Sequence, residues 1–146
     1  MRLWHKDFIP VLPRQQLLSQ WRECCCIAKN LAENGTPNHL LVNKILNYPP
    51  IHFESYCYRV TDEMHRRGYD ISKEPFERLQ ENIQIASRKE VFNRSTIGTL
   101  YEGWHNDRYL AQCYYNLQEK YDCGGITKDE WQKIEEVAAS RLKEES

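Results

Sequence analysis

One stretch near the start of the chain, residues 15–31, constrains the fold more than any other. Its apolar residues recur every three or four positions, which is the spacing of one face of an α-helix. Pro13 suits the first turn of a helix, and Asn34-Gly35 is a typical stop signal. The sequence therefore predicts a central amphipathic helix from Pro13 to about Glu33. Its apolar face consists of Leu17, Trp21, Cys24, Ala28 and Leu31.

Helical periodicity also dominates the rest of the chain, and no stretch alternates as a strand would. Residues 1–12 are expected to be extended, and residues 87–103 to form the longest loop. We therefore expect an all-α fold, with about five to six helices around the central N-terminal helix in one domain, residues 1–146. Three later helices are expected at residues 36–46, 51–67 and 74–85. A further helix is expected after a cap at Asn106 or Asp107 and before Gly124-Gly125, and the last one follows the capping box of Thr127 and Glu130.

The composition is that of a soluble globular protein. The chain has 146 residues, of which 40% are hydrophobic and 28% charged, and its formal net charge is −1. No apolar run is long enough to span a bilayer, and the charged residues Lys6 and Asp7 exclude a secretion signal at the start. We therefore expect a cytoplasmic protein that does not bind membranes.

Six cysteines are present, three of them consecutive at positions 24–26. Neighbouring cysteines cannot pair comfortably within a helix, so we expect free thiols packed in or near the core. No Cys or His grouping has the spacing of a zinc site, and no phosphate-binding glycine loop is present. The sequence predicts neither a metal nor a cofactor.

Arg22 and Glu23 lie next to each other, off the apolar face of the central helix. An adjacent cation and carboxylate are typical of a solvated ion pair, and that reading stays open from the spacing alone. The loop with Arg88-Lys89 and Trp104-His105 offers a second candidate, because cations hold phosphates and aromatic rings stack on bases. Residues 1–30 carry five cations against two acids, which permits an anionic partner.

Three motifs, taken in order, resemble the pyrimidine-dimer DNA glycosylase family. The first is Met1-Arg2, the second is Leu17-Leu18 followed by Trp21-Arg22-Glu23, and the third is Glu63-Met64-His65-Arg66-Arg67-Gly68-Tyr69-Asp70-Ile71. The resemblance covers residues 1–72 and is strongest to a bacterial branch whose members begin Met-Arg-Leu-Trp or Met-Arg-Ile-Trp.

The resemblance implies a DNA repair enzyme that works without a metal, as both a glycosylase and an AP lyase. In this mechanism the α-amine of the chain attacks C1′ of the damaged nucleotide, the base leaves, and the resulting imine undergoes β-elimination. An α-amine, with an ordinary pKa of about 7.7–8.0, has a neutral fraction near pH 7 without deep burial. The implied catalytic residues are Met1, as nucleophile, and Glu23, as acid and base. If Met1 is removed, Arg2 carries the amine instead.

The partner implied by the resemblance is damaged double-stranded DNA, carrying a pyrimidine dimer or another base lesion, and we expect a monomer. Arg2 and Arg22 are the contacts carried over from the family. The pairs Arg66-Arg67 and Arg88-Lys89 are further DNA-binding candidates because they are cationic. The alternative function is a non-catalytic helical module that binds nucleic acid or a protein through these two pairs.

Overall fold

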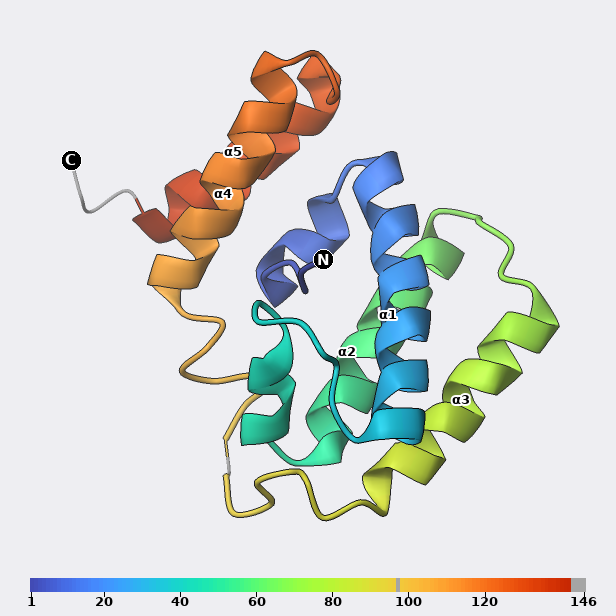
Figure 1. Ribbon diagram of the computed structural model, residues 1–146. Coiled ribbons are helices and arrows are strands. Elements are labelled where there is room, and N and C mark those ends of the chain that lie inside the picture. Colours follow the sequence, from blue (N-terminus) through green and yellow to red (C-terminus); the bar gives the residue numbers. More distant parts are fainter. Residues whose placement is uncertain (97, 143–146) are drawn as a thin grey trace.

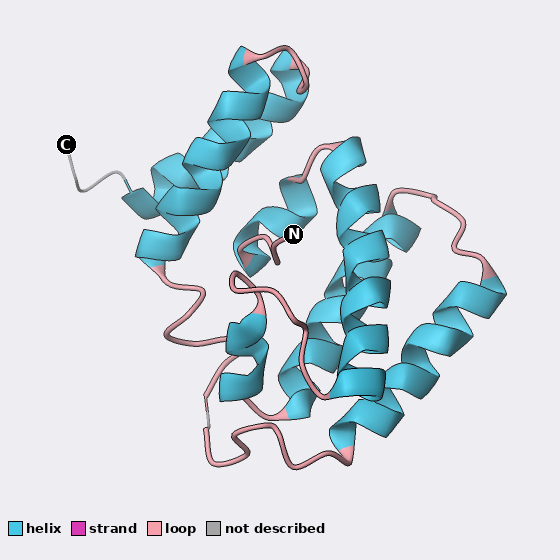
Figure 2. Ribbon diagram, in the orientation of Figure 1, coloured by secondary structure: helices cyan, strands magenta, loops and turns pink. Residues whose placement is uncertain are grey.

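The computed structural model describes residues 1–96 and 98–142 (Figure 1). These residues contain helices, turns and loops but no strand (Figure 2), which confirms the predicted all-α class. No helix within the described ranges has both the length and the hydropathy of a membrane span. The elements are η1 (Lys6–Val11), α1 (Arg14–Asn34), η2 (Asn43–Asn47), α2 (Pro50–Arg66), α3 (Lys73–Ser87), α4 (Asp107–Asp122) and α5 (Lys128–Leu142), where η denotes a 3-10 helix.

Helix α1 is the centre of the fold, and its bounds lie within one residue of the predicted ones. It packs most extensively on α3 and also against α2, as Figure 1 shows. Gly35 ends the helix with a φ of +72°, a left-handed conformation that suits glycine, and donates its N–H to the carbonyl of Leu31. The buried residues of α1 are Leu17, Gln20, Cys24, Ile27, Ala28 and Leu31.

The prediction of an extended segment over residues 1–12 is wrong for residues 6–11, which form η1. The cause is local, because the imidazole Nδ1 of His5 accepts the Asp7 N–H at 3.1 Å and so caps a tight turn. Phe8 and Ile9, both buried, then face the core from this turn. These two residues pin the segment to the core.

The prediction of a short helix over residues 36–46 is also wrong in its first half, because helical structure begins only at Asn43. Residues 35–42 form a loop in which Asn38 has a φ of +60°. The side chain of Asn30 on α1 donates to the carbonyl of Pro37 and holds the loop in place. Leu40 and Leu41 point away from the core and are 88% and 51% exposed.

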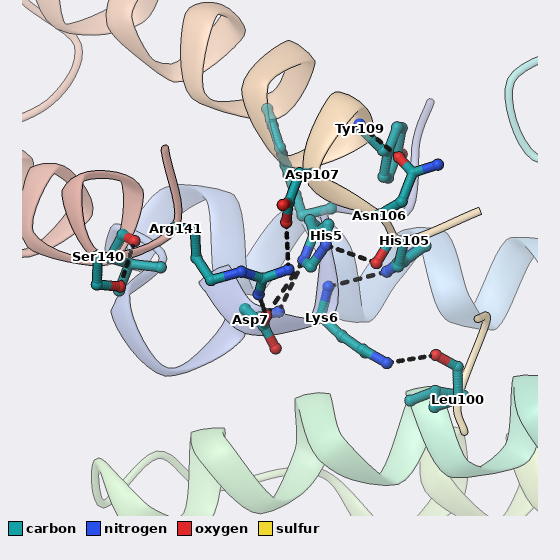
Figure 3. A network of polar contacts seen from close by, with 12 residues as sticks. His5, Lys6, Asp7, Leu100, His105, Asn106, Asp107, Tyr109, Ser140 and Arg141 are labelled. Atoms are coloured by element: carbon teal, nitrogen blue, oxygen red, sulfur yellow. Dashed lines mark hydrogen bonds and ion pairs between the residues drawn. The ribbon is translucent and has the colours of Figure 1, made fainter. Parts of the chain in front are cut away.

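Helices α4 and α5 form a pair that lies beside the α1–α3 group, with η1 between them (Figure 1). Asn106 caps α4, and reciprocal hydrogen bonds between Thr127 and Glu130 at the start of α5 confirm the predicted capping box. Arg141 on α5 forms ion pairs with Asp7 of η1 and Asp107 of α4 (Figure 3). The C-terminal pair is therefore tied directly to the start of the chain.

Two buried histidines join the N-terminal segment to the loop before α4 (Figure 3). Because the Nδ1 of His5 accepts a backbone N–H, its Nε2 carries the proton and donates to the His105 carbonyl at 2.9 Å. His105 in turn accepts the Lys6 N–H at its own Nδ1. Burial lowers the pKa of both rings, and the charge of Lys6 contributes; the pKa of His105 falls to about 2. Both imidazoles are therefore neutral at pH 7.

All six cysteines are free, as expected. Cys24, Cys57 and Cys113 are buried, and burial raises the pKa of the Cys57 and Cys113 thiols.

Candidate active site

The start of the chain lies against the middle of α1. The backbone N–H of Arg2 donates to Oε2 of Glu23 at 3.5 Å, and Met1 is 40% exposed. Within the described residues, no ion pair of 4.0 Å or less joins the Met1 amino group to Glu23. Both residues nevertheless line the same hollow, which has a volume of about 290 Å³. The remaining lining residues are Arg2, Trp4, Gln16, Ser19, Leu41, Asn116 and Lys120.

Gln20 fixes the relative position of the chain start and the carboxylate. Its Nε2 donates to the Arg2 carbonyl at 2.9 Å and to Oε2 of Glu23 at 3.2 Å. Its Oε1 accepts the Trp4 N–H at 2.8 Å and the Tyr56 hydroxyl at 3.0 Å. Gln20 is completely buried, so its amide is oriented by four protein partners rather than by solvent.

The side chain of Arg2 lies against Trp4 and helix α4. Its guanidinium is 5.3 Å from the centre of the Trp4 ring and its Nη1 contacts Sγ of Cys113 on α4 at 3.9 Å. Nearby, the Tyr109 hydroxyl of α4 donates to the Leu3 carbonyl at 2.5 Å. Arg2 therefore holds its charge at the hollow, and α4 fixes the backbone of the residue that follows it.

The other predicted DNA-binding residues do not line this hollow. Arg22 is exposed, but neighbouring positions on a helix point about 100° apart, and it faces away from the lining. Lys89 lies beside Gly35 at the far end of α1, roughly 18 Å along the helix from Glu23 at 1.5 Å per residue. Arg88, its exposed neighbour, follows the end of α3 at the same side of the fold.

Arg66 and Arg67 are engaged with Glu63 on α2. Glu63 is only 7% exposed and accepts hydrogen bonds from both guanidinium groups, including one from Nε of Arg67 at 2.6 Å. Burial alone raises the pKa of the carboxyl group, but the two arginines outweigh it and lower the pKa. Arg67 also donates to the Pro10 carbonyl, so it is a structural link, whereas Arg66 remains 65% exposed.

Trp104 and His105 do not form a base-stacking surface, and that part of the loop hypothesis is wrong. Both are buried, at 5% and 4% exposure, and pack with Tyr101 and Tyr109 in an aromatic cluster. Loop sequences that combine aromatic and charged residues do not by themselves distinguish a surface from a core contact.

Sequence reasoning missed Gln20, Asn116 and Lys120. Gln20 has a recognisable signal, because it is a polar residue three positions after Leu17 and four before Cys24, on the apolar face of the helix. A polar side chain at such a position requires buried partners. Asn116 and Lys120 carry no such signal, since only the packing of α4 brings them to the chain start.

The residues that meet at this hollow come mainly from the first half of the chain, and so does the match to known proteins. The family model for pyrimidine dimer DNA glycosylase matches residues 1–76, slightly more than half of the 146 residues. The chain belongs to this family. The resemblance seen in the sequence motifs is thereby confirmed at the level of the family. No curated protein and no solved structure matches the chain.

Membership of the pyrimidine dimer DNA glycosylase family makes the chain a DNA repair glycosylase whose substrate is DNA. The matched region contains η1, α1, η2, α2 and the beginning of α3, and with them Met1, Arg2 and Glu23. Asn116 and Lys120 lie outside it. The family match therefore covers the groups proposed to react, whereas one wall of the hollow comes from the unmatched half.

Proposed function

We propose that this DNA glycosylase is also an AP lyase, and that the α-amine of Met1 and the carboxylate of Glu23 carry both steps. The observation that supports the proposal most is their shared hollow of about 290 Å³. The carboxylate lies 3.5 Å from the Arg2 backbone nitrogen, one residue from the amine. A nucleotide sugar entering the hollow meets both groups at once.

In the first step the neutral amine nitrogen bonds to C1′ of the damaged nucleotide, and the bond from C1′ to the base breaks. The electron pair of that bond leaves with the base, which takes up a proton. The nitrogen then loses a proton, and its electron pair forms a C=N double bond as the bond from C1′ to the ring oxygen breaks and that oxygen takes up a proton. The ring-opened product is a cationic imine, which the carboxylate of Glu23 stabilises.

In the second step a proton leaves C2′, and its bonding electrons form a double bond as the bond from C3′ to the phosphate oxygen breaks. The carboxylate of Glu23 is the proposed base. Water then hydrolyses the imine and returns the free amine. The product is a strand cut on the 3′ side of the attacked nucleotide, with no redox step.

Two cationic groups of the hollow, Arg2 and Lys120, are proposed to hold the phosphates that flank the lesion, with Arg22 on the exposed side of α1 as a further contact. The exposed Arg66, Arg88 and Lys89 lie outside the hollow and are proposed only as distant contacts to the backbone. The protein is proposed to act as a cytoplasmic monomer, as one domain, on cyclobutane dimers in double-stranded DNA.

Borohydride trapping tests the proposal. Untagged protein is incubated in the presence of borohydride with duplexes that contain a cyclobutane dimer or an abasic site. The reduced adduct is then digested with a protease, and its peptides are identified by mass spectrometry. The expected product is an N-terminal peptide that carries the mass of the sugar, with its first residue identifying whether Met1 or Arg2 holds the amine. A protein that forms no adduct with either duplex refutes the mechanism and favours the non-catalytic module.

The role of Glu23 is tested with Glu23→Gln, which keeps the shape of the side chain. Strand cleavage is expected to fall by about 100-fold or more, within the usual range for acid–base groups. Glu33→Gln, an exposed change on the same helix, is the matched control and is expected to cleave normally. Normal cleavage by Glu23→Gln shows that another group moves the protons.

A further inference from the structure

The tip of the loop between α1 and η2 presents two adjacent leucines to solvent. Leu40 is 88% exposed and Leu41 51%, a larger exposure for Leu40 than for any other large apolar residue in the described ranges. Single exposed apolar residues need no explanation, but two neighbours at a loop tip form an apolar projection. Leu41 also lines the hollow that contains Met1 and Glu23.

This projection has a fixed shape. The His39 carbonyl accepts the N–H groups of Val42 and Asn43, and the side chain of Asn43 accepts the His39 N–H at 3.0 Å. The ring of His39 accepts the Leu41 N–H at 3.3 Å, and Val42 is fully buried directly after the tip. Hydrogen bonds within the turn and the buried Val42 therefore keep the two leucines exposed to solvent in a fixed position.

The position of the tip relates it to the reacting groups. Figure 1 shows the loop running back from the end of α1 alongside the helix to the region of the chain start, in agreement with the lining of the hollow. The exposed cation Lys44 follows the tip, and Lys120 lies within the hollow. An apolar projection flanked by cations suits the base stack of a duplex between its phosphates.

We propose that Leu40 and Leu41 form a wedge that enters the base stack of damaged duplex DNA next to the lesion. An enzyme that reaches C1′ of a damaged nucleotide in a duplex has to open the base stack at the lesion, which displaces a base, leaves a gap and costs unstacking energy. Apolar side chains that fill such a gap recover part of this cost and bend the duplex. Leu41, at the rim, faces the nucleotide in the hollow, and Leu40 enters the stack. This inference rests on the proposed function of the hollow.

The test compares double-stranded with single-stranded substrate. Leu40→Ala is expected to cleave a dimer-containing duplex about tenfold more slowly, and to cleave a single-stranded abasic oligonucleotide within about twofold of the wild-type rate, because no stack has to be opened. Leu41→Ala is also expected to slow cleavage of the duplex. Ile85→Ala, which shortens a 46% exposed residue on α3, is the matched control and is expected to retain both rates.

A 2-aminopurine placed opposite the lesion gives a direct signal, independent of cleavage. Wild-type binding is expected to raise its fluorescence, since the base loses its stacking partners, and Leu40→Ala is expected to reduce that rise. Equal losses of rate on both substrates, or unchanged fluorescence, overturn the wedge. So does a dimeric wild type that Leu40→Ala converts to a monomer, because the tip is then an interface between copies. Wild-type protein that unstacks the base but forms no imine adduct refutes the proposed chemistry while leaving the wedge supported.

Discussion

The side-chain amide of Gln20 donates to the carboxylate of Glu23 at 3.2 Å, across one turn of α1. The same amide group holds the Arg2 carbonyl, so one buried residue sets the position of both the chain start and the proposed acid–base group. Tyr56 reinforces the arrangement, because its hydroxyl lies within hydrogen-bonding distance of both Gln20 and the Trp4 carbonyl.

Replacing Gln20 with methionine, which has a similar size and no amide, is expected to lower the free energy of unfolding by about 2–4 kcal/mol. The reason is that the buried Trp4 N–H and Arg2 carbonyl lose their partners. Gln16→Met is the control, since the amide oxygen of Gln16 has no hydrogen-bond partner to lose, and a change below about 1 kcal/mol is expected. Urea denaturation measures the free energy of unfolding of both variants. If the two substitutions lower it equally, the hydrogen bonds of Gln20 have no special role in stability.

Lys120→Ala is expected to weaken binding to dimer-containing duplex and to reduce the slope of log affinity against log salt by about 1, as expected for the loss of one phosphate contact. Lys133→Ala removes an exposed cation from α5, outside the hollow, and is expected to leave the slope unchanged. The slope is obtained from binding affinities measured at several salt concentrations. Equal slopes for the wild type and Lys120→Ala mean that Lys120 does not contact DNA.

The buried histidines predict loss of stability in mild acid. Their pKa is lowered in the folded state, so the unfolded chain binds protons that the folded chain does not, and stability present above about pH 6.5 is lost as the pH falls. The limiting slope is about 1.4 kcal/mol per pH unit for each histidine. His105→Gln is expected to flatten the slope between pH 7 and 5, and the exposed His65→Gln is expected to leave it unchanged. Urea titrations at each pH measure the free energy of unfolding and so give this slope.

Glu63 predicts a second acid transition at lower pH. Its pKa is lowered in the folded state, so its contribution is present above the ordinary value of 4.5 and is lost as the pH falls through the folded value. At pH 7, Glu63→Gln is expected to cost about 1–2 kcal/mol of unfolding free energy, because it replaces charged hydrogen bonds from Arg66 and Arg67. The cost is expected to shrink towards pH 3, and a cost independent of pH contradicts the ionic account.

The sequence predicted the long helices well because their apolar spacing matches burial. Apolar residues at helical spacing on α2, such as Phe53 and Val60, are buried, and α1 begins and ends within a residue of its signals. Short elements were predicted poorly. A cap from His5 creates η1, and the apolar Leu40 and Leu41 face solvent although their spacing suggested a helix face.

The candidate site was predicted in part. Motif resemblance pointed to Met1, Arg2 and Glu23, which the fold brings to one hollow. Positive charge also made Arg67 a DNA-binding candidate, but its side chain is instead held by Glu63 and Pro10. The two lining residues from α4 could not be predicted from the sequence, because contacts between residues so far apart in the chain depend on tertiary packing rather than on local spacing.

Asn116 and Lys120 on α4 form one wall of the hollow, and this wall can be altered by protein engineering separately from the groups proposed to react. These two side chains line the hollow without taking part in the proposed bond-making steps. Asn116 is half-buried and Lys120 exposed, and both lie beside the buried face of α4 that contains Leu110 and Leu117. A combinatorial library at positions 116 and 120 therefore alters the shape and charge offered to a lesion while the amine, the carboxylate and the core stay intact.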